Sequence, residues 1–484
     1  MTPVDQRCMR KILIRFLPLL LICYVVAHLD RVNVGYAALT MNHDIGLTTA
    51  AFGLGAGLFF ITYFAFEIPS NLALERFGAR RWIARIMLTW GLLSGATAFV
   101  QGETGFYVVR LLLGAAEAGF FPGILIFLTL WVPGKWRATF VGSFMVAIPL
   151  ASVVGAPVSA FLINSPGLWG LKSWQTMFLI EAVPAIFLAF VVLRVLRDTP
   201  DQAEWLDPEE KRWLQQALAA ERQQASGGQK ETLVDILKNP RVWLLAFVYF
   251  GITGFSYGMA FFLPLILKDA NLSVMQTGVA TALPFAVGAI GMVVWGRRSD
   301  RLGERRQHVL IPLMIAVVGL AASTMAPSPW LKIVLISVSA FGVMAALPVF
   351  WTLPPLLFGA SIGAGGIAMI NSLGNISGFA HSLLMGVIRD KTGSYTYGLI
   401  LISVVGACGF IVLMVLTRKL SGRPGNSLSL TPQRQPTGCG SHTDFVTTGS
   451  RASAAYGGPA SSFGRGRSST HVKERGEADS HAAS

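Results

Sequence analysis

The sequence predicts an all-α membrane protein with twelve transmembrane helices, arranged as two six-helix halves. Three observations support this fold class. Apolar runs of 18 residues or more recur along the chain, which is the length that a helix needs to cross a bilayer. Only 13% of the residues are charged and 53% are hydrophobic, so a soluble globule of this composition would expose large apolar surfaces. In addition, one short charged motif occurs twice in the chain.

The apolar runs, taken in chain order, place six expected helices before a long polar insert and six after it. A mean hydropathy of +0.57 over the chain agrees with this content. The first run is too long for the core of a signal peptide and no small-residue cleavage site follows it, so we expect a retained helix. The expected spans are 16–40, 50–74, 83–100, 105–130, 138–163, 174–195, 241–267, 274–296, 308–327, 331–357, 362–388 and 395–417.

The net charge of +14 could indicate nucleic-acid binding, but the basic residues do not form one contiguous basic face. They lie between the apolar runs, and alternate loops carry most of them. By the positive-inside rule, these loops and both chain termini face the cytoplasm. We therefore expect a multi-pass protein of the plasma (inner) membrane, embedded in the lipid bilayer and without a nucleic-acid partner. The basic loops lie at residues 7–15, 76–81, 135–137, 297–306 and 418–423.

The insert and the C-terminal end differ in composition from the apolar runs. Within the insert, Asp207 followed by Pro208 indicates the N-cap of a surface helix that continues to about Arg222. From about residue 424, Gly, Ser, Thr and Ala dominate, which predicts a disordered cytoplasmic tail. The expected organisation is an N-terminal six-helix bundle at 1–195, a cytoplasmic linker at 196–240, a C-terminal six-helix bundle at 241–420 and the tail at 421–484.

The cysteines and the sequence motifs indicate no metal, cofactor or enzyme chemistry. The four cysteines are scattered, with no CxxC pair and no metal-ligand spacing, so neither a disulfide framework nor a zinc site is implied. The chain has no HExxH, Gly-x-Gly-Asp or Walker A motif. We therefore expect no cofactor and no hydrolytic or ATP-driven reaction.

The most specific signal is a duplication that follows the second expected helix of each half. An acid, an arginine, a glycine and a pair of arginines recur at the same spacing, 225 residues apart. Two ordinary basic loops are the alternative, but shared spacing at equivalent positions disfavours it. Parallel repeats of six helices are a known transporter architecture. The residues are Glu75, Arg76 and Gly78 in the first copy, and Gly296, Asp300, Arg301 and Gly303 in the second.

The repeated acids suggest a conformational role for this motif. An acid beside the end of one helix can pair with an arginine or a helix N-terminus in its neighbour. Such a contact could hold one conformation and break in another. A purely structural salt bridge is the alternative interpretation.

These loops resemble the signature of the major facilitator superfamily, a family of membrane transporters. The second copy has the full signature, whereas the first has Asn71 for the usual glycine and Glu75 for the usual aspartate. Stretches at 29–33, 67–71 and 110–123 resemble the anion:cation symporter branch, and the likeness covers about residues 10–420. It implies a permease similar to those for tartrate-like, phthalate-like and sugar-acid substrates. His28 departs from the pattern, where relatives generally carry tyrosine, and leaves the substrate open.

Four ionisable residues lie deep within the expected spans: Asp30, Arg31, Arg110 and Glu117. Each costs about 2.5–3.5 kcal/mol at the centre of a membrane helix, so we expect them to face the bundle interior. At 1.5 Å per residue, Asp30 lies about 15 Å, Glu117 about 18 Å and Arg110 about 8 Å from the outer ends of their helices. Arg110, Gly114 and Glu117 share one helical face, with the glycine leaving room between the two charges.

The charge types suggest roles for these four residues. Arginine offers a planar fork that matches a carboxylate, so Arg31 and Arg110 are candidate ligands of a substrate anion. Asp30 and Glu117 can be neutralised by protonation, which suits proton coupling. The family resemblance implies the same roles at the matching positions. A fixed structural ion-pair network is the alternative.

Further polar and aromatic residues are weaker candidates for substrate contact. Tyr63 could donate a hydrogen bond, although packing explains it equally well. Asn371 and Asn375 share a face of the eleventh helix and could contact substrate or join helices. Trp351 could line the site, but an aromatic residue there more often packs. His28 could titrate, although a satisfied buried histidine explains it as well.

The expected function is secondary active transport: proton-coupled symport of a small organic anion by a monomer. An anion exchanger or facilitator without proton coupling is the alternative within transport, and a sensor with a transporter fold is a second alternative. An intramembrane enzyme is disfavoured by the missing motifs.

Overall fold

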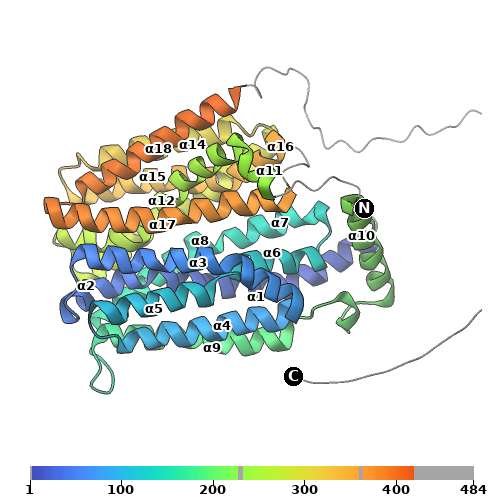
Figure 1. The fold of residues 1–484 in the computed structure, drawn as a ribbon, viewed down its shortest axis with the longest axis horizontal. Coiled ribbons are helices and arrows are strands. Elements are labelled where there is room, and N and C mark those ends of the chain that lie inside the picture. The colour runs from blue at the N-terminus through green and yellow to red at the C-terminus, as the bar shows by residue number, and fades with distance from the viewer. Residues whose placement is uncertain (1–2, 227–232, 359–362, 419–484) are drawn as a thin grey trace, which may run out of the picture. The chain divides into compact units, whose positions relative to one another are not determined.

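The computed structural model describes residues 3–226, 233–358 and 363–418, and all regular secondary structure in these ranges is helical (Figure 1). The expected tail at 421–484 lies outside the described residues. The N-terminal half contains α1 (Pro3–Val32), α2 (Val34–Asp44), α3 (Thr49–Phe77), α4 (Ala79–Ala96), the 3-10 turn η1 (Thr97–Phe99), α5 (Gly102–Glu117), α6 (Phe120–Trp131), α7 (Gly134–Met145), α8 (Ala147–Asn164) and α9 (Ser173–Val195).

Three of the six expected spans in this half are each made of two consecutive helices. Single residues separate α1 from α2 and α7 from α8, whereas two residues separate α5 from α6. The C-terminal half contains α12 (Pro240–Asp269), α13 (Val274–Leu302), α14 (Gln307–Ser323), α15 (Pro329–Phe350), α16 (Leu353–Phe358), α17 (Gly363–Thr392) and α18 (Thr396–Leu416).

Twelve long helical segments therefore correspond to the twelve expected spans. Among the described residues, nine of them are both long and apolar enough to cross a membrane by length and composition. The helix α14 is apolar but has only 17 residues. Arginines at positions 80, 81 and 85 make the first two turns of α4 polar, and Asn371 and Asn375 lower the hydropathy of α17. The length of α14 and the polar residues of α4 and α17 therefore keep these three helices out of the nine.

The polar insert forms the 3-10 turn η2 (Pro200–Gln202), α10 (Pro208–Ser226) and α11 (Leu233–Lys238). The helix expected after Asp207 is present, and the backbone N–H of Asp207 donates to the Glu210 carboxylate at 3.0 Å. Lys11 of α1 pairs with Asp207 at 2.9 Å and with Glu210 at 2.8 Å. The insert is thus attached to the beginning of the first span.

Close helix contacts join the two halves, above all those of α3 with α17 and of α8 with α13. Glycines permit the approach, because a Cβ on Gly53 would lie 2.3 Å from the Ser382 carbonyl oxygen. The Asp390 carboxylate of α17 also accepts hydrogen bonds from the backbone N–H groups of Thr49 (3.2 Å) and Ala50 (2.8 Å), which begin α3. An acid from one half therefore caps a helix of the other.

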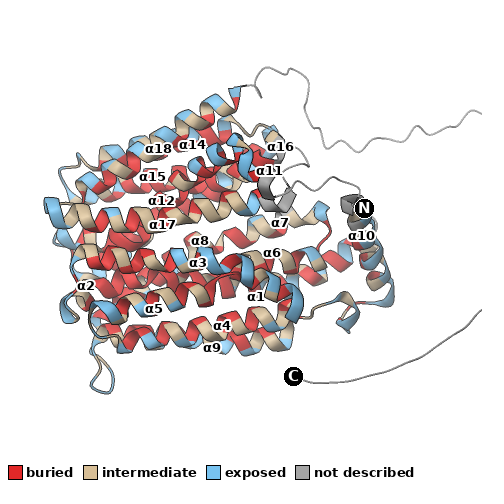
Figure 2. Cartoon of the chain, viewed as in Figure 1, coloured by how far each residue is buried: buried red, intermediate tan, exposed pale blue. Residues whose placement is uncertain are grey.

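Burial divides many of the long helices into an inner and an outer face, whereas α12 is mostly buried (Figure 2). Large aromatic side chains such as Phe59, Trp90 and Trp131 are fully buried between helices. On the outer faces, large apolar side chains are exposed, and this is the surface that a bilayer would cover. Examples on the outer faces are Ile68, Val183, Phe187, Ile290, Val318 and Val415.

Candidate functional site

The centre of the candidate site is a buried ion pair between α1 and α5. A terminal nitrogen of Arg31 donates to the Glu117 carboxylate, and these side chains are 9% and 2% exposed. The other terminal nitrogen of Arg31 donates to the hydroxyl of Tyr257 on α12, at 3.1 Å. That hydroxyl in turn donates to Asn375 Oδ1 on α17, at 3.2 Å. One arginine of the N-terminal half is thus connected to two helices of the C-terminal half.

Arg110 lies on the same buried cluster but has a different environment. Its guanidinium carbon and that of Arg31 are each 5.1 Å from the centroid of the Phe59 ring, which both arginines therefore contact. A terminal nitrogen of Arg110 donates to the Ala56 carbonyl oxygen at 3.3 Å, and its Nε has no hydrogen-bond partner. Within the described ranges, no carboxylate lies within 4.0 Å of this guanidinium, although the residue is only 1% exposed. Arg110 is therefore a buried cation with spare hydrogen-bond donors.

Two glycines of the fourth span set the position of Glu117 and Arg110. A Cβ on Gly114 would lie 2.1 Å from the Phe59 carbonyl oxygen, so this glycine permits close packing of α5 on α3. Gly114 was expected to leave room between Arg110 and Glu117, but the neighbours closest to its added Cβ are in α3. Gly119 has φ +85° and separates α5 from α6. The glycine in the left-handed region ends α5 close to Glu117.

Asp30 faces the bundle interior, as expected for a charge within a span, but it lies apart from the arginine cluster. Its carboxylate accepts from the indole nitrogen of Trp90 at 2.9 Å and from the Ser94 hydroxyl at 3.3 Å, both on α4. No arginine lies within 4.0 Å of this carboxylate in the described part of the chain. The sequence placed Asp30 beside Arg31, but consecutive helical residues point about 100° apart and face different neighbours.

Asn371 lies next to a carboxylate of the opposite half. Glu67 of α3 accepts from Asn371 Nδ2 at 3.4 Å and from the Ser372 hydroxyl at 2.8 Å, both on α17. Asn375 contacts Tyr257 instead, so the two asparagines bind different partners in different helices. Both asparagines of the eleventh span therefore join helices in this conformation.

Of the two aromatic candidates, Tyr63 contacts the arginine cluster, whereas Trp351 packs against Tyr249. The ring of Tyr63 is 5.1 Å from the guanidinium carbon of Arg31, so Tyr63 belongs to the cluster through its ring face. Trp351 follows α15 and packs edge-on against Tyr249, with ring centroids 4.8 Å apart. Tyr249 lies two turns before Tyr257 on α12. Trp351 therefore contacts a residue two helical turns away from the cluster.

In this conformation, no described residue of a neighbouring helix pairs with Glu75 or Asp300 of the repeated motif, so the latch that these acids suggested stays a prediction. Glu75 and Arg76 are exposed at the end of α3, and Gly78 has φ +87° where α4 begins. The acid at the start of α4 is Asp198, which accepts from the backbone N–H of Arg80 at 2.8 Å.

In the second copy, Asp300 pairs with Arg305 of its own loop at 2.7 Å. Arg301 is exposed, Gly303 ends α13 with φ +65°, and no atom lies within 4 Å of a Cβ built on Gly296. The two copies thus share a glycine with positive φ but not their ionic contacts.

Besides the four deep ionisable residues expected from the sequence, two further carboxylates are buried within the expected spans. Glu67 and Glu181 are 4% and 5% exposed. Both lie within expected spans, so the charge argument applied to the other four would have identified them. Tyr257 was also missed, and no sequence signal distinguishes it from the other tyrosines of the chain.

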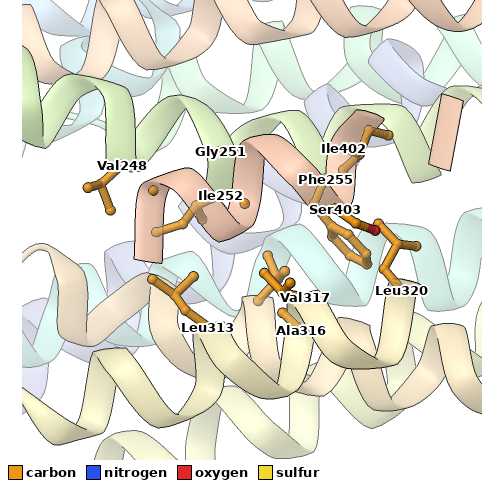
Figure 3. Close-up of a pocket in the computed structure, with 13 residues that line it drawn as sticks. Val248, Gly251, Ile252, Phe255, Leu313, Ala316, Val317, Leu320, Ile402 and Ser403 are labelled. Atoms are coloured by element: carbon orange, nitrogen blue, oxygen red, sulfur yellow. The ribbon is translucent and has the colours of Figure 1, made fainter. Parts of the chain in front are cut away.

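Chemically, the cluster offers two buried arginines, one of them without an acid, and hydroxyl and amide groups from the other half. This set can bind a carboxylate and hydrogen-bond to a hydroxyl group. The described residues hold no group of three His, Cys, Asp or Glu side chains suited to a metal ion. The cavity drawn in Figure 3 lies elsewhere, among α12, α14, α15 and α18, and its lining is apolar apart from Ser403. An anion would find no charge partner there.

Comparison with known proteins identifies relatives over most of the chain. The model of the Major Facilitator Superfamily matches residues 20–381. The "Putative tartrate transporter" of Agrobacterium vitis is 45% identical over 415 residues, which cover 86% of this chain and 96% of the relative. The "Putative metabolite transport protein NicT" of Pseudomonas putida is 42% identical, covering 79% and 88% of the two chains. The "Inner membrane transport protein RhmT" of Escherichia coli is 38% identical, covering 86% and 96%.

Solved structures with the same fold are more distant in sequence. A bacterial homologue of the human lysosomal transporter Spinster aligns with a TM-score of 0.67 at 18% identity, covering 88% of this chain and 100% of the other. The D-xylose–proton symporter aligns with a TM-score of 0.64 at 14% identity, covering 84% and 97%. These likenesses show the fold, with the helices of both halves arranged as in these transporters.

Proposed function

The chain belongs to the major facilitator superfamily of secondary transporters, and on this premise we propose that it carries a small organic anion across the membrane together with protons. The substrate is a carboxylate, of the tartrate-like, phthalate-like or sugar-acid class. Arg31 and Arg110 bind the carboxylate, and Glu117 and Asp30 carry the protons.

The observation that supports anion binding is the buried guanidinium of Arg110. A buried charge without an opposite charge is costly, because its loss of hydration is not repaid. Among the described residues, Arg110 donates to a carbonyl oxygen and contacts an aromatic ring but forms no ion pair within 4.0 Å, while Arg31 beside it already pairs with Glu117. A substrate carboxylate would supply the missing negative charge and accept from the free donors of both arginines.

The polar groups around the arginines favour a hydroxylated acid. Tyr257 and Asn375 offer a hydroxyl and an amide next to Arg31. A hydroxy dicarboxylate such as tartrate could place a carboxylate on the arginines and hydroxyl groups against these two residues. The name of the Agrobacterium vitis relative agrees with this class.

Proton coupling follows from competition for Arg31. Burial disfavours the charged form of Glu117, and the neighbouring guanidinium favours it. An arriving substrate carboxylate competes for the same guanidinium, so Glu117 then holds a proton more readily. The loaded carrier buries less net charge, which lowers the cost of reorientation. Asp30, held by neutral donors, is the second candidate proton carrier.

The remaining assignments concern the whole chain. We infer a monomer of the inner membrane, with two six-helix bundles at 1–195 and 241–420, a cytoplasmic linker at 196–240 and both termini in the cytoplasm. The inner-membrane relative RhmT supports the location. The repeated motif, with Glu75 and Asp300, acts in the change between conformations through its glycine turns and charged loops.

Uptake of radiolabelled tartrate into proteoliposomes tests the proposal. With the purified protein and an imposed inward proton gradient, we expect tartrate to accumulate above its external concentration, and dissipation of the gradient with a protonophore to abolish accumulation. Equal uptake with and without the gradient would favour the alternative, an anion exchanger or facilitator. No uptake of any mono- or dicarboxylate from a panel, by protein that is folded, would contradict anion transport.

A further inference from the structure

Glu181 is a buried carboxylate that the proposed transport cycle does not use. It lies on α9, is 5% exposed and accepts from the Ser159 hydroxyl of α8 at 2.6 Å. It also accepts from Asn33 Nδ2, between α1 and α2, at 2.9 Å. No Lys, Arg or His nitrogen lies within 4.0 Å of it in the ranges that the structure describes. A carboxylate with only neutral partners inside a membrane bundle is costly when charged.

Both partners of Glu181 can serve either of its charge states. A hydroxyl group donates to a carboxylate and equally accepts from a carboxylic acid. The Asn33 side chain donates through Nδ2 in this conformation, while its Oδ1 is buried without a hydrogen-bond partner. A half-turn of this amide would bring Oδ1 to Glu181, where it would accept a hydrogen bond from the carboxylic acid. The surroundings therefore support both the ionised and the neutral form.

We propose that Glu181 is a proton-binding carboxyl, separate from Glu117 and Asp30, that alternates between two hydrogen-bonded states with Asn33 and Ser159. A hydronium ion transfers its proton to the carboxylate. The carboxylate becomes a neutral acid, and the hydronium ion becomes a water molecule. The Asn33 amide then turns from donor to acceptor. The role of this site in coupling rests on the proposed function, whereas proton binding itself does not.

The titratable groups that face Glu181 are few. On α1, Asp30 lies three residues before Asn33, the amide partner of Glu181, and on α2 Tyr36 lies three residues after Asn33. The helix α8 and the turn η1 contain no titratable residue. The arginines of α4 lie in its first two turns, whereas its contacts with Ala182, next to Glu181, are made by Gly95 near the other end. Among the described residues, no basic side chain therefore forms an ion pair with Glu181, which leaves its charged form without a cation partner.

The position of Glu181 allows access when the halves move. Its partner Ser159 lines a small cavity between α1, α2, α8, α12 and α13, together with Ser152 and Tyr36. The Ser152 hydroxyl is buried there without a hydrogen-bond partner. Next to this cavity, Gly278 of α13 packs closely against Ala156 and Ala160 of α8, so the contact between the two halves closes it. Separation of α8 from α13 would open a polar path toward Glu181.

Infrared difference spectroscopy of the full-length protein in lipid nanodiscs tests proton binding without any substrate. A pH step should produce a carboxylic-acid C=O band that is lost in Glu181→Gln, because the amide keeps similar size and hydrogen bonds but has no proton to exchange. The matched control Glu103→Gln removes an exposed carboxyl on α5 and should leave the band unchanged. In Ser159→Ala the band should shift in frequency, because one hydrogen-bond partner is gone. If Glu181→Gln does not fold, the band shift in Ser159→Ala still tests the proposal.

A transport measurement then separates the coupling role from binding. The number of protons taken up per labelled tartrate should fall by one in Glu181→Gln, as measured with a pH-sensitive dye inside proteoliposomes. An unchanged band in Glu181→Gln and no shift in Ser159→Ala would overturn the proposal, even if tartrate transport is established. Loss of the band together with an unchanged proton count would overturn the coupling role. If no acid is transported at all, the infrared result still decides whether Glu181 binds a proton.

Discussion

Arg31 and Arg110 carry the same charge and contact the same Phe59 ring, yet they have different partners. Arg31 is held by Glu117 and Tyr257, which fix its fork and connect it to the other half. Arg110 has a ring and one carbonyl oxygen, so it can gain most from a ligand. In the proposed site, Arg31 would thus be the positioned arginine and Arg110 the available one.

The first prediction concerns Arg110→Lys. Lysine keeps the charge but loses the planar fork, so tartrate binding should weaken by about 10- to 100-fold, which corresponds to the roughly 1.5–3 kcal/mol of a hydrogen bond to a charged group. Arg31→Lys should weaken binding at least as much, because its pairing with Glu117 also changes. Isothermal titration of purified protein measures the affinity. Arg194→Lys, at the exposed end of α9, is the control. Wild-type affinity in both variants would remove these arginines from the site.

The second prediction separates coupling from binding through Glu117→Gln. The permanently neutral amide should abolish accumulation of labelled tartrate driven by a proton gradient. Exchange of tartrate at equal concentrations should persist at least in part, because exchange requires no net release of protons. Both are measured in proteoliposomes, with Glu204→Gln in the exposed linker as the control. If Glu117→Gln still concentrates tartrate against a gradient, Glu117 is structural and the proton site lies elsewhere.

At the scale of elements, the helix interruption between α5 and α6 positions the charged cluster. The helix α5 ends at Glu117, and a two-residue link at Ala118 and Gly119 turns the chain into α6. In broken membrane helices, such interruptions lie where ligands bind. Gly119 fits here because its φ of +85° suits glycine and its missing Cβ leaves space for Ser70, whose Oγ would be 2.4 Å away.

The third prediction tests this link with Gly119→Ala. A left-handed residue with a side chain costs about 1–2 kcal/mol, and the contact with Ser70 adds to this cost. The variant should therefore unfold at a lower temperature in detergent, as followed by intrinsic fluorescence. Gly142→Ala is the matched control, since Gly142 lies within α7 and no atom is within 4 Å of its added Cβ. Equal melting temperatures for the two variants would show that the link tolerates a side chain.

At the scale of the whole molecule, contacts between the halves occur at several levels. Asp390 caps α3, Tyr257 binds Arg31, and Ser372 binds Glu67. All are hydrogen bonds between groups that could bind water or substrate instead, so they can break when the halves move relative to each other. The chain thus combines tight packing at glycines with exchangeable polar contacts.

The fourth prediction tests the orientation in the membrane. In a background with all four native cysteines replaced by serine, Ser273→Cys should react with an impermeant maleimide from outside intact cells. Arg297→Cys should react only after permeabilisation, because we expect the basic end of α13 and the loop that follows it to face the cytoplasm. Both positions are exposed, so accessibility is decided by the side of the membrane. Equal labelling of the two in intact cells would contradict the proposed topology.

The sequence by itself determined the helical class, the number of long helical segments, the surface helix after Asp207 and the family. These properties depend on local composition and spacing, since a bilayer selects long apolar helices and charged residues mark their ends. It also identified Arg31, Arg110 and Glu117 as candidates, because a charged residue within an apolar span is costly and faces the bundle interior. The same reasoning, applied without omission, would have included Glu67 and Glu181.

Only the tertiary structure decided which of these charges meet. Pairing depends on the rotation of each helix about its axis and on its neighbours, and a difference of one residue turns a side chain by about 100°. Asp30 therefore faces Trp90 and Ser94, while Arg31 reaches Glu117 across 86 residues of chain. Tyr257 joins the site from the other half, a contact that no spacing within one span encodes.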